Sequence, residues 1–227
     1  MADKKSQPDA EREYLPSMGK HFLLPLYDLM HRLSGLRRIH REMGTLAGLL
    51  AGHEVLDVGC GTGNLLRTVG RQYPGAELTG LDPDRKALAR ARRKARRAGI
   101  DVRLDRGFAQ ELPYPDGSFD RVFSSLMLHH LDTASKDELL AEVRRVLRPD
   151  GLLVLADVVV DEHGHGHGHR PGGHGRMSEH VRDNVGDAVA RRIAAAGFTV
   201  EPTRTMALRV GGRIAIEVAR PGSGAVP

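Results

Sequence analysis

A glycine-rich turn is the feature of this sequence best suited to chemistry. It lies within residues 55–64, where the chain reads VLDVGCGTGN and places Gly59, Gly61 and Gly63 at alternate positions. Because glycine has no Cβ, such a turn can bend tightly and bring its backbone close to a ligand. Asp82 stands nineteen residues after Gly63, and its carboxylate could accept hydrogen bonds from both hydroxyls of a ribose. The spacing predicts a site for a nucleoside-type ligand.

The same turn differs from the two common phosphate-binding patterns. It lacks the later glycine of the dinucleotide fingerprint, and it does not match the P-loop pattern G-x-x-x-x-G-K-S/T. Asp57 lies just before the turn, where its charge would repel a pyrophosphate but attract an ammonium group. We therefore expect a ligand that carries an ammonium group.

Two groups of histidines are candidates for proton transfer and for metal binding. His129 and His130 could supply a general base, because imidazole titrates near neutral pH, with structural packing as the favoured alternative. Further along, the His/Gly loop 161–176 could gather imidazoles around Zn²⁺, Ni²⁺ or Cu²⁺, although it has no fixed zinc-site spacing. The alternative is a polar insertion without a physiological metal. The candidate metal ligands are His163, His165, His167 and His169.

The elements that must position these residues alternate between strand and helix after residue 52. Repeated βα units predict a parallel sheet with right-handed crossovers, and a final hairpin at Gly211-Gly212 adds an antiparallel edge. We therefore expect a Rossmann-like α/β fold with a seven-stranded, mostly parallel sheet. The predicted strands are 54–58, 77–81, 102–104, 119–125, 152–160, 198–207 and 213–219, and the predicted helices end near 73, 98, 147 and 196.

The segment before this domain has a helical pattern. Apolar residues recur at steps of three and four over 16–50, with Gly35 and Gly44 as the predicted breaks between two or three helices. We expect this segment to form a lid over the site. The predicted organisation is a disordered tail 1–13, a helical lid 14–50, a ligand-binding domain 51–220 and a flexible tail 221–227.

Composition indicates a globular protein of a reducing compartment. No run approaches the roughly 18 apolar residues that a membrane span needs, and the polar N-terminus has no secretory signal. The single cysteine, Cys60, cannot form an internal disulfide, so we expect a cytoplasmic location. The net charge of +5 is concentrated in Arg90–Arg97, which we interpret as the solvated face of a helix, because no aromatic residues are interleaved with it.

The glycine turn and several later segments resemble the class I S-adenosylmethionine-dependent methyltransferases. The resemblance covers roughly residues 50–160 and is similar to the ubiquinone/menaquinone-biosynthesis C-methyltransferases in particular. It implies the fold, S-adenosylmethionine as cofactor and methyl transfer, but says little about the acceptor. The segments that carry it are VLDVGCGTG at 55–63, LDP at 81–83, ELPY at 111–114, FDRV at 119–122, LHHL at 128–131 and RVLRPDG at 145–151.

The resemblance also implies roles for single residues. The strand end and glycine turn hold the methionine portion of the cofactor, and the acidic residue after the second strand binds the ribose. Residues 108–110 line the adenine pocket, with Phe108 where the family often has an acidic residue. Tyr27 of the lid is a further candidate, with core packing as its alternative. The cofactor-binding candidates are Asp57, Gly59, Gly61, Gly63, Asp82, Phe108, Ala109, Gln110, Ser125 and Tyr27.

We therefore expect a methyltransferase that acts on a small lipophilic or aromatic acceptor, because the lid helices are apolar. Two alternatives stay open. One is a metal-responsive binding protein that keeps the fold and uses the His/Gly loop. The other is an RNA methyltransferase directed by Arg90–Arg97. We expect neither a nucleic-acid partner nor a membrane span, and the sequence does not indicate an oligomeric state.

Overall fold

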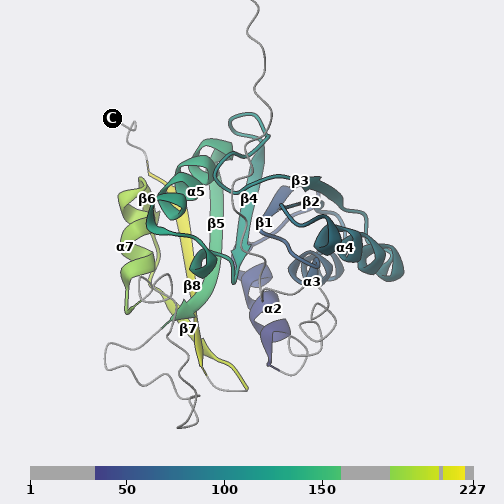
Figure 1. Cartoon of the computed structure of the whole chain (residues 1–227), viewed down its shortest axis with the longest axis horizontal. Helices are drawn as coiled ribbons and strands as arrows, with labels where there is room; N and C mark the ends of the chain where they lie inside the picture. Colours follow the sequence, from purple (N-terminus) through teal and green to yellow (C-terminus); the bar gives the residue numbers. More distant parts are fainter. Residues whose placement is uncertain (1–33, 160–184, 210–211, 223–227) are drawn as a thin grey trace, which may run out of the picture.

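Eight strands form one mixed sheet in the computed structural model, which describes residues 34–159, 185–209 and 212–222 (Figure 1). The strand order is β3-β2-β1-β4-β5-β8-β6, and β7 pairs with β8 off this path. β1 to β5 are parallel, whereas β8 runs antiparallel to β5. The strands are β1 Glu54–Val58, β2 Glu77–Asp82, β3 Arg103–Arg106, β4 Phe119–Ser125, β5 Leu147–Val159, β6 Phe198–Val200, β7 Arg204–Ala207 and β8 Arg213–Pro221.

The expected mostly parallel α/β sheet with antiparallel C-terminal strands is confirmed, but it has eight strands rather than seven. The predicted strand 198–207 is divided into β6 and β7, which pair with different parts of β8. Pro202 lies in the gap between them. Proline has no backbone N–H and interrupts a ladder of hydrogen bonds. The count of eight strands therefore arises because one predicted strand, 198–207, is divided into two.

Helices cover both faces of the sheet (Figure 1). The buried apolar residues of α2, α3 and α4 cluster with Val55, Phe123 and Val154 on one face. Those of α5 and α7 cluster with Leu56, Val122 and the alternate residues of β5 on the other. No helix in the described part of the chain is long and apolar enough to cross a membrane. The helices are α2 Leu36–Ala47, α3 Asn64–Gln72, α4 Arg85–Ala98, η2 Leu128–His130, α5 Thr133–Val146 and α7 Ala188–Ala195.

The boundary predicted at Gly35 agrees with the start of α2, whereas the break predicted at Gly44 is wrong. α2 begins after Gly35, which has a φ of 86°, and runs through Gly44 to end before Gly48. A Cβ on Gly44 would lie 3.0 Å from the Gln72 Oε1 atom. Gly44 therefore serves the close packing of α2 against the end of α3. The preceding part of the predicted lid, including Tyr27, lies outside the described residues, so the lid remains a prediction.

The sequence Pro149-Asp150-Gly151 does not separate helix from strand as the pattern predicts. α5 ends at Val146, and β5 already begins at Leu147. The register jumps from the pair Phe119 and Leu147 to the pair Arg121 and Leu152. The expected turn is therefore an irregularity inside β5, with its residues left out of the pairing with β4.

The basic helix α4 has the two faces that its pattern predicts. The Asp84 side chain caps it by accepting a hydrogen bond from the Lys86 N–H at 2.7 Å. Leu88, Ala91 and Ala95 are buried against the sheet. Most of its basic side chains are exposed, which agrees with a solvated face; the exposed ones are Arg85, Lys86, Arg92, Arg93, Arg96 and Arg97.

Candidate functional site

The candidate site lies where β1 and β4 end side by side. β1 is flanked by β2 and β4, so the connections that leave these strands turn toward opposite sides of the sheet. Such a switch point opens a crevice at the carboxyl edge of an α/β sheet, where ligands bind. The glycine turn follows β1, and Leu126 and Met127 follow β4.

The three glycines of the turn have different surroundings. All have positive φ angles, 72° at Gly59, 53° at Gly61 and 73° at Gly63, which L side chains rarely adopt. A Cβ on Gly59 would lie 2.4 Å from Met127 Cγ, and one on Gly63 would lie 3.0 Å from Ala91 Cβ. A Cβ on Gly61 would meet no described atom within 4 Å. Two glycines are therefore required for packing, whereas Gly61 faces open space.

Asp82 ties the end of β2 to this turn. Its Oδ2 accepts a hydrogen bond from the Gly61 N–H at 2.8 Å, and its Oδ1 accepts one from the Asp84 N–H at 2.9 Å. The side chain is buried, and this burial raises its pKa despite the two N–H donors, which act to lower it. Asp82 therefore shapes the turn as well as offering carboxylate lone pairs beside it.

Asp57 is a buried carboxyl group whose hydrogen bonding is incomplete. It is 2% exposed, and its Oδ2 has no hydrogen-bond partner among the described residues. Burial raises its pKa well above the ordinary value, and the negative charge of Asp82 adds to this increase. A cation next to Asp57 would satisfy the unpaired oxygen and favour the charged form. The structure thus fits the ammonium-bearing ligand that the sequence predicts.

A lysine from the basic helix supports the back of the glycine turn. The Lys94 Nζ atom donates hydrogen bonds at 2.8 Å to both Thr62 Oγ1 and Asn64 Oδ1. Asn64 is the first residue of α3, so Lys94 fixes the point where the turn becomes a helix. Sequence reasoning assigned the charges of α4 to solvent and missed this contact.

The predicted adenine segment lies next to Asp82, after β3. Phe108 and Gln110 are half-buried and Ala109 is buried, while the preceding Gly107 N–H donates to the Asp82 carbonyl at 3.4 Å. Arg145 anchors the chain just beyond it. Its guanidinium group donates hydrogen bonds to the carbonyl oxygens of Leu112 and Tyr114 and to the carboxylates of Asp116 and Glu142.

The β4 side of the crevice carries backbone strain and a buried histidine. Leu126 has a φ of 56° and is the non-glycine residue with positive φ in the described ranges. Ser125, just before it, lies 3.1 Å through its Oγ atom from Nε2 of His40 on α2. His40 is 4% exposed and was not found by sequence reasoning. α2 is therefore joined to the carboxyl end of β4.

His129 is held by a buried carboxylate, whereas His130 is exposed. The His129 Nδ1 atom lies 2.6 Å from Asp157 Oδ1, and the His129 backbone N–H donates to Asp157 Oδ2 at 3.2 Å. Asp157 is 1% exposed and lies near the carboxyl end of β5. The centroids of the two histidine rings are 4.1 Å apart. Sequence reasoning missed Asp157, although a single acidic residue in the apolar run of β5 was a visible signal.

The structure does not place every predicted site residue. Tyr27 and the four candidate metal ligands, His163, His165, His167 and His169, lie outside the described residues. Within the described ranges, no group of three or more His, Cys, Asp or Glu residues is arranged to hold a metal ion. The metal prediction thus gains no support.

Comparison with known proteins finds a match to methyltransferases. Residues 55–151 match a family described as "Methyltransferase domain". A demethylmenaquinone methyltransferase of Thermus thermophilus is 38% identical over 138 residues, which cover 60% of this chain and 62% of the relative. The chain spans 39% and 62% of the lengths of the first two curated relatives that it matches.

Two solved structures share the fold at low sequence identity. The cyclase SpnF is 24% identical with a TM-score of 0.68, over 83% of this chain and 81% of that chain. Phosphoethanolamine N-methyltransferase 2 of Haemonchus contortus is 16% identical with a TM-score of 0.73, over 92% of this chain and 59% of that chain. The latter was solved in complex with phosphomonomethylethanolamine and S-adenosylhomocysteine.

Proposed function

We propose that the chain transfers the methyl group of S-adenosylmethionine to a small lipophilic or aromatic acceptor. Residues 55–151 match a methyltransferase domain, and relatives that the chain matches in part include ubiquinone/menaquinone-biosynthesis enzymes. The observation that carries the proposal is the state of the glycine turn. A Cβ on Gly61 would meet no described atom within 4 Å, the Gly61 N–H donates to the Asp82 carboxylate, and Asp57 in the strand before the turn has a buried Oδ2 without a described partner.

We assign a part of the cofactor to each of the candidate residues. Asp57 would attract the ammonium group of the methionine portion, and Asp82 would accept hydrogen bonds from the ribose hydroxyls. Residues 108–110 would line the adenine pocket, and Ser125 would lie near the methionine portion. A solved structure of this fold holds S-adenosylhomocysteine, which supports the same ligand chemistry here. When bound, the cofactor supplies a methyl group on a sulfonium, which departs as a neutral thioether.

His129 is the candidate general base of this reaction, and Asp157 is its positioning residue. A carboxylate 2.6 Å from Nδ1 favours the tautomer with the proton on Nδ1. Nε2 is then left as the acceptor for a proton from the methyl acceptor. His130 is exposed and its ring lies beside that of His129, so it would help to orient the ring rather than take the proton. Holding the acceptor in line with the methyl group supplies much of the remaining acceleration.

The acceptor class rests on relatives that the chain matches only in part. Several curated relatives are demethylmenaquinone methyltransferases, which suggests a hydroxylated aromatic ring with a lipophilic side chain. Purified protein should transfer labelled methyl from S-adenosylmethionine to demethylmenaquinol and produce one S-adenosylhomocysteine per methyl transferred. Simple phenols and amines with and without an apolar tail would then define the acceptor.

The two alternatives predict different results in the same experiment. A protein that uses the fold only for binding would take up S-adenosylmethionine and release no S-adenosylhomocysteine with any acceptor. The fold alone does not fix the reaction, since the similar structure of SpnF is that of a cyclase. An RNA methyltransferase would instead label RNA. The metal-responsive alternative and the cytoplasmic location stay predictions from sequence.

A further inference from the structure

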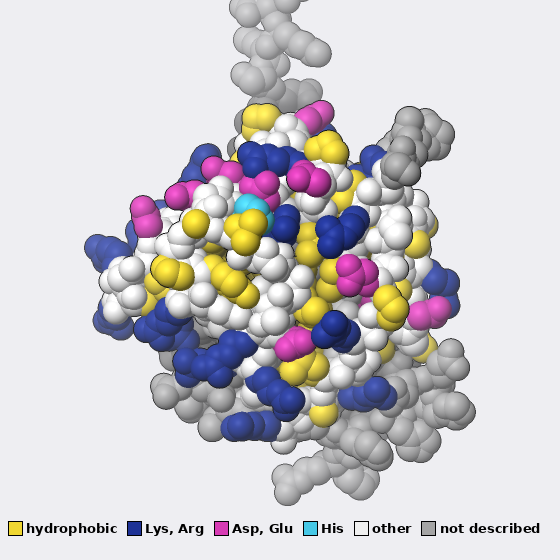
Figure 2. All heavy atoms as spheres, turned by 180° about the vertical axis from the view of Figure 1, so that it is seen from behind, with side chains coloured by type: hydrophobic (Ala, Val, Ile, Leu, Met, Phe, Trp, Pro, Cys, Tyr) yellow, Lys and Arg dark blue, Asp and Glu magenta, His cyan; other side chains and the backbone are white. Residues whose placement is uncertain are grey.

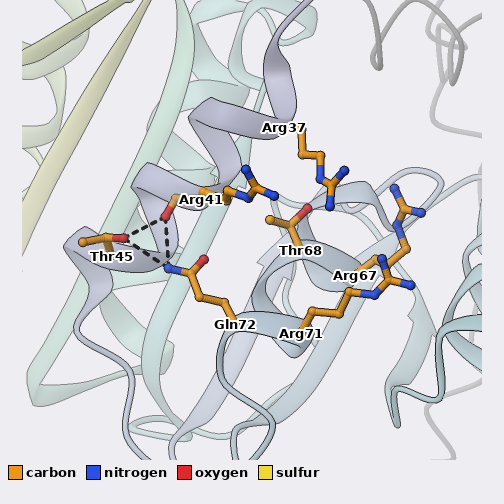
Figure 3. Close-up of a pocket in the computed structure, with 7 residues that line it drawn as sticks. All are labelled: Arg37, Arg41, Thr45, Arg67, Thr68, Arg71 and Gln72. Carbon is orange, nitrogen blue, oxygen red and sulfur yellow. Dashed lines mark hydrogen bonds between the residues drawn. The ribbon is translucent and has the colours of Figure 1, made fainter.

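A basic groove lies between α2 and α3, outside the cofactor crevice (Figure 3). Its volume is about 410 Å³, within the roughly 300–1,000 Å³ range of small-molecule sites. Figure 3 shows arginine side chains from both helices extending into the space between them. The groove is lined by Arg37, Arg41 and Thr45 of α2 and by Arg67, Thr68, Arg71 and Gln72 of α3.

The four arginines are arranged as two facing pairs of like charge. Arg37 and Arg41 are four residues apart on α2, and Arg67 and Arg71 are four apart on α3. Like charges at this spacing destabilise a helix, and here two such pairs face the same groove. Arg37, Arg41 and Arg71 form no salt bridge with any residue that the structure describes. The carboxylate of Glu42, next in sequence to Arg41, pairs with Arg204 at 3.2 Å instead.

The neutral side chains of the groove have already used their donor hydrogens. The Gln72 amide donates to the Arg41 carbonyl and to Thr45 Oγ1, at 3.4 and 3.1 Å. The hydroxyls of Thr45 and Thr68 donate to carbonyl oxygens of their own helices. These bonds leave the guanidinium groups of Arg37, Arg41 and Arg71 as donors for a ligand. A ligand would therefore be recognised mainly through its negative charge.

We propose that this groove binds a multiply charged phosphate-type oxyanion, with diphosphate as the simplest example. Guanidinium groups present planar forks of N–H donors that match phosphate oxygens and are more weakly hydrated than ammonium groups. A diphosphate between α2 and α3 would bring negative charge to Arg37, Arg41 and Arg71, which form no salt bridge with the described residues. The ligand is either the free anion or a small molecule that ends in a diphosphate.

The shape and position of the charges favour a small anion over RNA. Figure 2 shows Lys and Arg in a broken band over one face of the molecule, which is the kind of surface that a nucleic acid would follow. The groove instead gathers its arginines from two neighbouring helices around one concavity. Among the residues that the structure describes, its lining has no aromatic side chain on which a base could stack. The test must therefore distinguish the binding of RNA from the binding of a small anion.

The test uses the full chain and inorganic diphosphate as the probe. Calorimetric titration at low ionic strength should show saturable binding with one site per chain, weaker binding of inorganic phosphate, and no effect of chloride at matched ionic strength. Arg41→Gln/Arg71→Gln should weaken diphosphate binding at least about tenfold, because two charged hydrogen-bond donors are lost. The charge-matched control Arg38→Gln/Arg93→Gln removes two exposed arginines outside the groove and should leave the affinity within about twofold.

Melting temperatures of the same variants provide a second test, which shows whether the substitutions affect folding rather than binding. Without anion, Arg41→Gln/Arg71→Gln should melt at the same temperature as the wild type or higher, because repulsion is removed. Diphosphate should raise the melting temperature of the wild type and of the control, but not that of the groove variant. A titration with ADP separates the two sources of the ligand. Tighter binding of ADP than of free diphosphate would indicate a small molecule that ends in a diphosphate, and weaker binding would indicate the free anion. Equal losses in both double variants, or tighter binding of single-stranded RNA that depends equally on Arg93, would overturn the proposal.

Discussion

The two sides of the carboxyl edge are built in different ways. On the β1–β2 side, backbone N–H groups of the glycine turn contact the end of β2: those of Gly59 and Cys60 donate to the Leu81 carbonyl at 2.9 Å, and that of Gly61 donates to Asp82 Oδ2 at 2.8 Å. On the β4–β5 side, side chains from distant segments meet. Ser125 contacts His40 across 85 residues of sequence, and Asp157 holds His129 across 28.

This difference matches the tasks that we assign to the two sides. The β1–β2 side offers open space at Gly61 and buried carboxylates, which suit an invariant cofactor. The β4–β5 side carries the strained residue Leu126 and the braced His129, which suit an acceptor and a proton transfer. Changes on the first side should therefore alter cofactor affinity, and changes on the second should alter turnover at unchanged cofactor affinity.

The largest expected effect is that of Gly61→Val. The added side chain would extend into the open space beside the turn, so S-adenosylmethionine binding should fall below detection by calorimetry. Gly99→Val is the matched control, because Gly99 also has a positive φ, 64°, and a Cβ added there would meet no atom within 4 Å. Both variants carry the same kind of backbone strain, and circular dichroism should show both folded. Loss of binding in both, or in neither, would contradict the placement of the cofactor.

The next effect tests the β4–β5 side. His129→Gln should lower kcat by on the order of 10²–10⁴-fold, the usual contribution of general base catalysis, with the Kd for S-adenosylmethionine unchanged. Asp157→Asn should lower kcat as well, and its effect should largely disappear when His129 is already glutamine. Additive losses in the double variant would show that Asp157 acts independently of His129.

A smaller effect is expected for Asp82→Ala. Loss of a charged acceptor for the ribose hydroxyls should weaken S-adenosylmethionine binding by on the order of 1–3 kcal/mol. Calorimetry measures it, with Asp101→Ala as an exposed carboxylate control. Asp82→Asn separates two contributions, because the amide keeps one acceptor for the Gly61 N–H. Unchanged affinity in both variants would mean that the ribose is held elsewhere.

The smallest effect concerns the pH dependence of stability. Burial raises the pKa of Asp57, so between its ordinary value and this raised value the folded protein holds a proton that the unfolded chain has released. The stability of the ligand-free protein must therefore fall as pH rises through that window. Asp57→Asn should remove this part of the slope and raise the stability at neutral pH by on the order of 1 kcal/mol, while cofactor binding weakens. Thermal melts at several pH values would show an unchanged slope if the account of Asp57 is wrong.

The same contrast explains what the sequence could predict. β1 and β4 have the predicted bounds, because the apolar pattern of each strand is contiguous and local. The pairing of His129 with Asp157 depends on β4 and β5 lying side by side, and no spacing in the sequence encodes it. Pro202 was visible, but its division of a strand depends on how β8 pairs with both halves.

The most direct test of the account is hydrogen exchange of the wild-type protein with and without S-adenosylhomocysteine. We predict slower exchange at residues 59–63, 82–84 and 107–110, which surround the open space at Gly61, and unchanged exchange at the α2–α3 groove. The Gly61→Val variant should show no difference on addition of the ligand. Protection confined to other segments, or no protection at a saturating ligand concentration, would contradict the claim that the β1–β2 side of the carboxyl edge holds the cofactor.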